Sequence, residues 1–357
     1  MKMRIVHVAS GREWRGGQNQ VRLLARALQN QTEFDQLVVT GRNSELARRL
    51  ATASVPLRLT TWNSALDPRT LVAVIREARG GNVILHAHDA HALVLAGIAA
   101  RLTGAKLVVT RRVDFHLRRP GFWRRADRVI AISEAIRDVL LSDGIPEDRI
   151  VVVHSGIDPA EVRSAPASGI RAVYQLAPNV PLAVNVAALV PHKDHGTLIA
   201  ASVETSRELP GLHWIIAGDG PLLPLLMERV RQAGLEERVH FAGHVSNPWG
   251  VIAEANVFVM SSREEGLGTS ILDAMALEIP VAATSAGGIP EILADGAGVL
   301  VPVGDGIQLG RAVSSLLKDN DLRRKTLEKA RERLNRFTDQ AMADRVRSVY
   351  RSILPNG

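Results

Sequence analysis

The sequence predicts an α/β protein with two doubly wound domains, and three observations support this. Its 357 residues exceed the usual size of one domain, so two hydrophobic cores are expected. Short runs of Val, Ile and Leu alternate with amphipathic stretches along almost the whole chain. Such runs, separated by helices, are typical of parallel sheets covered on both faces. The alternation loosens only over residues 155–181, a Gly- and Pro-containing stretch that we predict to be the interdomain linker.

The first domain is predicted to span residues 1–165. It starts with a buried strand at Met3–Ala9, followed by a helix at Gln18–Gln29 with Val21 and Leu24 on one face. Further strands are expected at 37–40, 57–60, 83–86, 107–110, 129–132 and 150–153, with helices near 68–79, 91–102 and 134–142.

The second domain is predicted to span residues 166–337, and the C-terminal helix lies within 338–357. Strands are expected at 182–187, 214–217, 239–241, 257–260, 281–283 and 299–301. Doubly wound sheets bind ligands at the carboxyl ends of their strands. Two such sheets that face each other would form an interdomain cleft.

Composition excludes several classes of protein. The chain has no Cys, which excludes disulfides, thiol catalysis and Cys-ligated metals, and fits a reducing compartment. It has neither an apolar run of about 18 residues nor a signal peptide at its start, so a cytoplasmic protein is expected.

The net charge of +7 is unevenly distributed. Residues 1–165 hold 25 basic and 16 acidic residues, a net of +9, and the remainder has a net of −2. This asymmetry suggests an anionic partner: nucleic acid, a membrane surface or a phosphorylated substrate. Arg-rich codon usage is the alternative, because only six of the 44 basic residues are Lys.

Two loops that each precede a helix are candidate phosphate-binding sites. In the first domain, Gly16-Gly17 precedes a helix whose N–H groups favour anions, although an ordinary tight turn would look the same. The loop lacks the GxGxxG pattern, so a nicotinamide dehydrogenase is disfavoured. In the second domain, Lys193 and His192 stand just before a helix, where an ammonium group suits phosphate oxygens.

Two further loops of the second domain carry carboxylates. Gly218-Asp219-Gly220 follows a strand, and Asp219 could simply cap the next helix. Glu264 and Glu265 lie in the loop that precedes a helix predicted to start near Ser270. A carboxylate beside an anion site suits a nucleotide-sugar, which offers hydroxyls as well as phosphates. For Asp273, a capping box formed with Ser270 is the alternative role.

Three other clusters have several explanations. Residues 110–128 contain seven Arg, and the Arg pairs with Phe122 and Trp123 suit either an anionic membrane surface or a solvated basic face. His86, His88 and His91 have the residue types of metal ligands, but acceptor binding or core packing is expected instead. Asp319-Asn320-Asp321 spells a DxD metal motif and is predicted to cap a helix.

Taken in order, these motifs resemble those of the family 4 glycosyltransferases of the GT-B fold, over nearly the whole chain. The residues that carry the resemblance are Gly16-Gly17, Ala126–Ser133, His154–Asp158, Lys193, Gly218–Pro221, Glu265–Gly268, Gly287–Glu291 and Val301–Asp305.

The resemblance implies two Rossmann-like domains that face an interdomain cleft, and retaining transfer of a sugar from a nucleotide-diphosphate-sugar. Lys193 would neutralise the diphosphate, Glu265 would hold hydroxyls of the transferred sugar, and Asp273 would bind the ribose. The final helix would pack back on the first domain. Donor contacts are also expected from Gly218, Asp219, Gly220, Gly266, Leu267, Gly268 and Thr269, and cleft or acceptor contacts from Gly16, Gly17, Arg111, Arg112 and Asp114.

Two positions depart from the family pattern. Asp273 replaces the usual Glu, and Ala188 stands where an Arg is usual, five positions before Lys193. An inactive nucleotide-sugar-binding homologue therefore stays open as an alternative. A GT-B enzyme of another reaction type, such as a sugar-nucleotide epimerase, is a further alternative.

The expected partners are the nucleotide-sugar donor and a glycan or lipid-linked acceptor, in cell-envelope or lipopolysaccharide synthesis. An anionic membrane is a further expected contact of the Arg-rich first domain. Neither a metal, another cofactor nor nucleic acid is expected.

Overall fold

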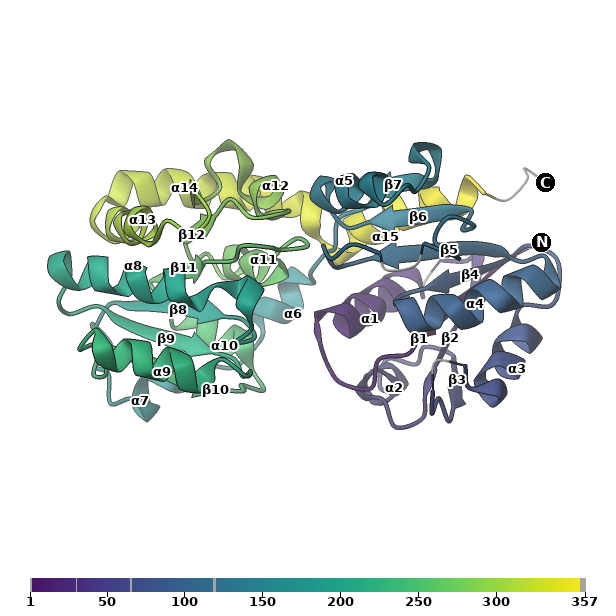
Figure 1. The fold of residues 1–357 in the computed structure, drawn as a ribbon, viewed down its shortest axis with the longest axis horizontal. Helices are drawn as coiled ribbons and strands as arrows, with labels where there is room; N and C mark the ends of the chain where they lie inside the picture. Colours follow the sequence, from purple (N-terminus) through teal and green to yellow (C-terminus); the bar gives the residue numbers. More distant parts are fainter. Residues whose placement is uncertain (1, 30, 65, 118–119, 354–357) are drawn as a thin grey trace. The chain divides into compact units, whose positions relative to one another are not determined.

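The computed structural model describes residues 2–29, 31–64, 66–117 and 120–353, and the chain folds into two compact units. The first unit comprises Met1–Gly156 and Thr338–Gly357, and the second comprises Ile157–Phe337 (Figure 1). Each unit contains one parallel sheet with helices on both faces, as predicted from the alternating sequence pattern. No helix among the described residues is both long and apolar enough to cross a bilayer.

The first unit has a seven-stranded sheet in the order β3-β2-β1-β4-β5-β6-β7, in which all neighbours pair in parallel. The strands are β1 (Met3–Ala9), β2 (Phe34–Gly41), β3 (Leu57–Thr60), β4 (Val83–Ala87), β5 (Lys106–Arg111), β6 (Arg128–Ala131) and β7 (Ile150–Val152). The helices are α1 (Gly16–Leu28), α2 (Glu45–Ala51), α3 (Pro68–Glu77), α4 (Ala90–Thr103), α5 (Glu134–Ser142) and α15 (Asp339–Arg351).

The second unit has a six-stranded sheet in the order β10-β9-β8-β11-β12-β13, again entirely parallel. The strands are β8 (Leu182–Val186), β9 (His213–Ala217), β10 (Val239–Gly243), β11 (Val257–Met260), β12 (Val281–Thr284) and β13 (Val299–Val301). The helices are α6 (Pro159–Arg163), α7 (Ile170–Val173), α8 (His195–Glu208), α9 (Leu223–Gln232), α10 (Pro248–Ala253), α11 (Thr269–Ala276), α12 (Ile289–Leu293), α13 (Gly306–Lys318) and α14 (Asn320–Leu334).

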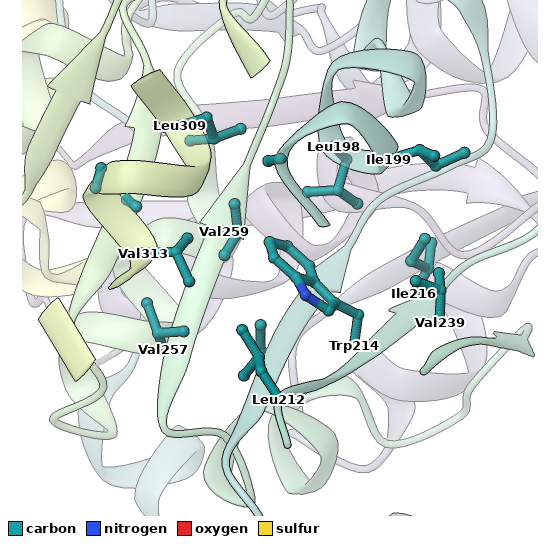
Figure 2. Close-up of a cluster of buried hydrophobic side chains, with 14 of the residues drawn as sticks. Leu198, Ile199, Leu212, Trp214, Ile216, Val239, Val257, Val259, Leu309 and Val313 are labelled. Carbon is teal, nitrogen blue, oxygen red and sulfur yellow. The ribbon is translucent and has the colours of Figure 1, made fainter. Parts of the chain in front are cut away.

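The hydrophobic core of the second unit surrounds Trp214 of β9, whose side chain is 1% exposed. Figure 2 shows its indole ring between side chains of the sheet and of the helices that cover it, including Leu198 of α8 and Val313 of α13. Because alternate residues of a strand point to opposite faces, Trp214 and Ile216 share the face that α8 covers.

Helix α15 returns to the first unit and completes its core. Val346, Val349 and Tyr350 are buried together with Ile5 of β1 and Leu24 of α1. A 3.6-residue repeat of apolar side chains gives the helix this single buried face.

The chain passes between the units at Gly156. The side chain of Gln20 in α1 donates to the Gly156 carbonyl at 2.8 Å and accepts from its N–H at 3.1 Å. A Cβ atom at position 156 would lie 2.3 Å from the Thr338 carbonyl oxygen, where the chain returns, so glycine is required there.

From Ile157 onward, the predicted linker at 155–181 is a folded part of the second unit. Glu254 accepts hydrogen bonds from the N–H groups of Gly169, Ile170 and Arg171, which anchors the start of α7. Residues 157–165, which we assigned to the first domain, also lie in the second unit, where Arg163 donates to the Ala276 carbonyl. Gly and Pro indicate turns, but they do not show whether a segment packs.

Candidate functional site

In the second unit, two loops at the carboxyl ends of neighbouring strands bring Lys193 and Glu265 together. Strands β8 and β11 pair directly, Lys193 lies in the loop after β8, and Glu265 lies in the loop after β11. The Lys193 ammonium group forms an ion pair with Glu265 Oε2. The two side chains are 17% and 13% exposed, so the pair is largely shielded yet accessible to a ligand.

Hydrogen bonds and one glycine hold this pair in place. Ser262 Oγ donates to Glu265 Oε2 at 3.3 Å, and Ser261 Oγ donates to the Lys193 carbonyl at 3.0 Å. The N–H of Gly288 donates to the Glu265 carbonyl at 3.0 Å. Gly287 has φ +48°, and a Cβ there would lie 1.8 Å from the same carbonyl oxygen. Ser261 and Ser262 could not be predicted as members of the site, because serine in a loop carries no distinctive signal.

Helix α11 starts beside Glu265 without a side-chain cap. It begins at Thr269, one residue earlier than predicted, and its N-cap is Gly268 with φ +91°. The first N–H groups of a helix have no partner within it, so they and the helix dipole favour an anion at this end. Gly266 and Leu267 are buried in the loop that leads to the helix.

Asp273 does not form the capping box that its spacing from Ser270 suggested, because both residues lie inside α11. Its side chain is half-buried, and burial raises its pKa from 3.8 to about 7, although a hydrogen bond from the Trp249 side chain opposes the shift. Burying an ionisable carboxyl group destabilises the folded protein near neutral pH. Carboxyl groups with such a raised pKa are often found at functional sites.

The Gly218-Asp219-Gly220 loop packs against the loop that leads to Lys193. The Leu189 N–H donates to the Asp219 carbonyl at 2.9 Å, and a Cβ at Gly218 would lie 1.9 Å from the Ala187 carbonyl oxygen. Asp219 does not cap the next helix, since α9 starts only at Leu223, and its exposed carboxylate accepts from the Gly220 N–H at 2.7 Å. These glycines therefore have a packing role whether or not a ligand binds here.

The cation that the family pattern leads one to expect near Lys193 is replaced by the exposed Ala188. Arg263, the next cation in this loop region, forms an ion pair with Asp194 at 2.8 Å. Asp194 in turn caps α8 through Thr197, so the charge of Arg263 is already balanced by a structural carboxylate.

In the first unit, Arg112 lies against the start of α1. This helix begins at Gly16, and its N-cap residue Arg15 makes no side-chain capping bond. A Cβ at Gly17 would lie 3.7 Å from Arg112 Cδ, and nothing lies within 4 Å of a Cβ at Gly16. Burial lowers the pKa of Arg112 to about 10, so the guanidinium remains charged at neutral pH. The structure thus brings Gly16, Gly17 and Arg112 together.

Arg111 and Asp114 do not join that group. Arg111 lies 5.4 Å from the ring centroid of Trp123 and donates to the Phe115 carbonyl. Trp123 is only 5% exposed, so the suggested membrane contact through Trp123 is wrong. Asp114 is half-buried, and its negative charge acts on Arg111, where it opposes the lowering of the Arg111 pKa by burial. Two of the seven arginines in this segment, at positions 118 and 119, lie outside the described residues.

Three histidines form a buried cluster that contacts Arg112 through His88. They are His7 of β1, His86 of β4 and His88 immediately after β4. Their ligand atoms lie within 4.8 Å of one another, whereas the predicted third member, His91, is exposed on α4. Both nitrogens of His86 are hydrogen-bonded, at 2.6 Å to Tyr350 and at 2.7 Å to Thr110. The two hydrogen bonds of His86 fit the core-packing role predicted for it, and Arg112 lies beside His88. Sequence spacing could not identify His7, because it comes from a different strand.

The predicted DxD motif is a helix cap. Asp319 Oδ1 accepts from the N–H groups of Asp321 and Leu322 at 2.9 Å each and so begins α14. This confirms the capping role predicted for Asp319.

Two family models match the chain. The model described as "Glycosyltransferase Family 4" matches residues 14–161, and the one described as "Glycosyl transferases group 1" matches residues 168–333. The matches fall on the two compact units in turn.

Individual relatives carry related names. The chain is 30% identical over 274 residues to the GDP-mannose-dependent alpha-(1-6)-phosphatidylinositol monomannoside mannosyltransferase of Mycobacterium tuberculosis, with 73% of this chain and 67% of that protein covered. It is 32% identical over 176 residues to the lipopolysaccharide core biosynthesis glycosyltransferase LpsE of Rhizobium meliloti, with 49% and 51% covered. The chain thus spans about half the length of LpsE.

Among solved structures, HepE of Anabaena in complex with UDP has a TM-score of 0.83 at 21% identity. The alignment covers 98% of this chain and 100% of HepE, so the likeness extends over the whole two-unit fold.

Proposed function

The chain belongs to the family 4 glycosyltransferases, and from this premise we propose that it transfers a sugar from a nucleotide-diphosphate-sugar to a glycan or lipid-linked acceptor. We place the reaction in cell-envelope polysaccharide or lipopolysaccharide synthesis, at the cytoplasmic side of the membrane. The names of the relatives support the part of this assignment that concerns envelope synthesis.

The observation that carries the proposal is the Lys193–Glu265 pair beside the uncapped start of α11. Lys193 and the helix N–H groups supply positive charge for a diphosphate, and Glu265 supplies acceptor oxygens for sugar hydroxyls. One small region therefore offers both kinds of contact that a nucleotide-sugar requires. Asp273, on the same helix, supplies a carboxyl group for the ribose hydroxyls.

The proposed mechanism retains the configuration of the sugar and needs no metal. The bond between the sugar C1 and the β-phosphate oxygen breaks, and the acceptor oxygen forms its bond to C1 on the same face. The departing phosphate takes the acceptor proton. Lys193 and the α11 N–H groups stabilise the charge that grows on the leaving diphosphate. We expect turnover to persist in excess EDTA, and its loss would contradict metal independence.

In the first unit, we propose that Arg112 and the first N–H groups of α1 bind an anionic group of a substrate, for which a phosphorylated or lipid-phosphate-linked acceptor is the chemical match. The +9 charge of residues 1–165 supports this assignment. Arg112 has no ion-pair partner among the described residues. The nearby Asp89 carboxylate already has partners, because Oδ1 accepts from Ser10 Oγ and from the Ala92 N–H, and Oδ2 accepts from the Ser10 N–H.

A two-stage experiment tests the proposal. Thermal-shift measurements with UDP-, GDP- and ADP-sugars identify the donor, because a bound ligand raises the melting temperature by mass action. With that donor, Lys193→Ala should lower kcat by about 100-fold or more, the usual effect of removing a charge-stabilising donor. The matched control is Lys318→Ala, because Lys318 is an exposed lysine of α13 paired with Glu208. Equal turnover in both variants would overturn the role of Lys193.

A further inference from the structure

Arg112 donates a hydrogen bond to His88, and His88 is hydrogen-bonded in turn to His7. Strands β1 and β4 are neighbours in the sheet, and His7 lies directly opposite His86 in their register. His88 follows β4, and its N–H donates to the Val8 carbonyl at 3.0 Å. His7 and His86 are fully buried, and His88 is 6% exposed, so these rings are shielded from bulk water.

The charge of Arg112 determines which way the hydrogen bonds run. A guanidinium group can only donate, and its terminal nitrogen lies 3.2 Å from His88 Nδ1. His88 Nδ1 must therefore accept, which places the single proton of a neutral His88 ring on Nε2. That nitrogen lies 3.0 Å from His7 Nδ1 and donates to it. His7 then carries its own proton on Nε2, an atom that is buried with no hydrogen-bond partner among the described residues.

The surroundings keep His88 neutral. Burial holds the pKa of His88 well below its ordinary value, and the positive charge of Arg112 acts in the same direction. Burial likewise lowers the pKa of His7 to about 4. A protonated His88 would have no lone pair for Arg112 and would place a second cation beside it.

The hydrogen bond to His88 fixes the orientation of the Arg112 guanidinium, the group proposed to bind the anion. Its Nε atom is buried without a hydrogen-bond partner, and its side chain passes over Gly17 at the uncapped start of α1. His88 is the hydrogen-bond partner that the structure gives the guanidinium among the described residues. Without it, the long Arg112 side chain would keep its charge but lose its direction.

We infer that His88 is a positioning residue for Arg112, and that the His7–His88 chain sets the ring tautomer that aims the guanidinium at the anionic group of the substrate. This inference rests on the anion-binding role proposed for Arg112. His88 itself touches no substrate and acts through Arg112 alone.

The test measures binding of inorganic phosphate by ³¹P NMR titration of the full chain, in a Lys193→Ala background that removes the proposed site of the second unit. His88→Phe keeps a ring but removes the acceptor, and it should weaken phosphate binding about tenfold, the usual value of a hydrogen bond to a charged group. His88→Asn should restore the affinity to within about threefold, because the Asn Oδ1 atom takes the place of Nδ1.

Two controls separate positioning from general loss of structure. His86→Phe alters the same buried cluster but not the bond to Arg112, so phosphate affinity should stay within about threefold of the parent. In the Arg112→Ala background, adding His88→Phe should change the affinity no further, since the two residues act as one unit.

The outcomes are distinguishable. If Arg112→Ala leaves phosphate binding unchanged, the proposed anion site fails and the inference falls with it. If Arg112→Ala weakens binding and a folded His88→Phe does not, only the inference is overturned. A measurement that needs no variant is ¹⁵N NMR of the wild-type histidines at neutral pH. It should show His88 with a bare Nδ1 and a protonated Nε2, and the opposite tautomer or a charged ring would also overturn the inference.

Discussion

Replacing Asp273 by Asn should stabilise the protein above neutral pH and leave its stability nearly unchanged at low pH. Burial raises the pKa of Asp273 from 3.8 to about 7 in the folded state. Between these two values the folded chain keeps a proton that the unfolded chain has released, so the free energy of unfolding falls as pH rises through this window. The loss is complete above pH of about 7.

The magnitude follows from the size of the shift. A difference of about three pKa units corresponds to about 4 kcal/mol, at about 1.4 kcal/mol per unit. Because the Asp273 side chain keeps part of its surface exposed, this value is the upper limit. Asparagine pays no such cost, since it carries no charge at any of these pH values.

The assay is urea unfolding of wild type and Asp273→Asn at pH values between 4 and 8.5, followed by tryptophan fluorescence. The difference between the two proteins isolates position 273, because all other titrating groups are common to both. The variant's advantage should grow from near zero at pH 4 toward its limit at pH 8.5. A constant difference across that range would refute the argument that burial holds this carboxyl group near its neutral form.

Two further changes test other parts of the second unit. Gly287→Ala should destabilise the protein by about 2–4 kcal/mol in urea unfolding and weaken donor binding, because its Cβ would displace the Glu265 carbonyl at a positive φ. Gly234→Ala, at φ +65° with nothing within 4 Å, should cost only about 1 kcal/mol, and equal costs would contradict the steric account. Glu254→Gln should cost about 2 kcal/mol near neutral pH. Burial would raise the pKa of Glu254, but hydrogen bonds from Ser168 and the start of α7 outweigh it and lower the pKa below 4.5. The stability that Glu254 contributes is therefore lost as pH falls below about 4.5, and a gap between Glu254→Gln and wild type that persists at pH 3 would contradict the assignment.

Every strand in the described part of the chain was predicted, and four of them with their observed bounds. Met3–Ala9, Val257–Met260 and Val299–Val301 have the predicted bounds, since a strand buried in a parallel sheet is a short apolar run. Leu57–Thr60 also has the predicted bounds, although this edge strand exposes its two central residues. Helix starts were less accurate. Helix α1 begins at Gly16, before the first apolar residue of its buried face, and periodicity gives no signal for such a turn.

Local patterns misled where two explanations share the same spacing. Ser270 and Asp273 have the spacing of a capping box, but Gly268 takes the N-cap position because its positive φ ends the preceding loop. The Gly- and Pro-containing stretch after residue 155 has the composition of a linker, yet the carboxylate of Glu254 anchors it to the second unit.

The sequence by itself determined the two doubly wound domains, the order of the motif-bearing loops and the types of residue that each loop carries. These properties depend on periodicity and on neighbours along the chain. Only the tertiary structure decided which residues meet. Lys193 and Glu265 are 72 positions apart and form a pair because β8 and β11 are adjacent in the sheet. Arg112, His88 and His7 come together through the order β1-β4-β5, and Tyr350 reaches His86 across 264 positions because α15 returns to the first unit. Sheet order and chain return are set by packing between distant segments, which no local pattern encodes.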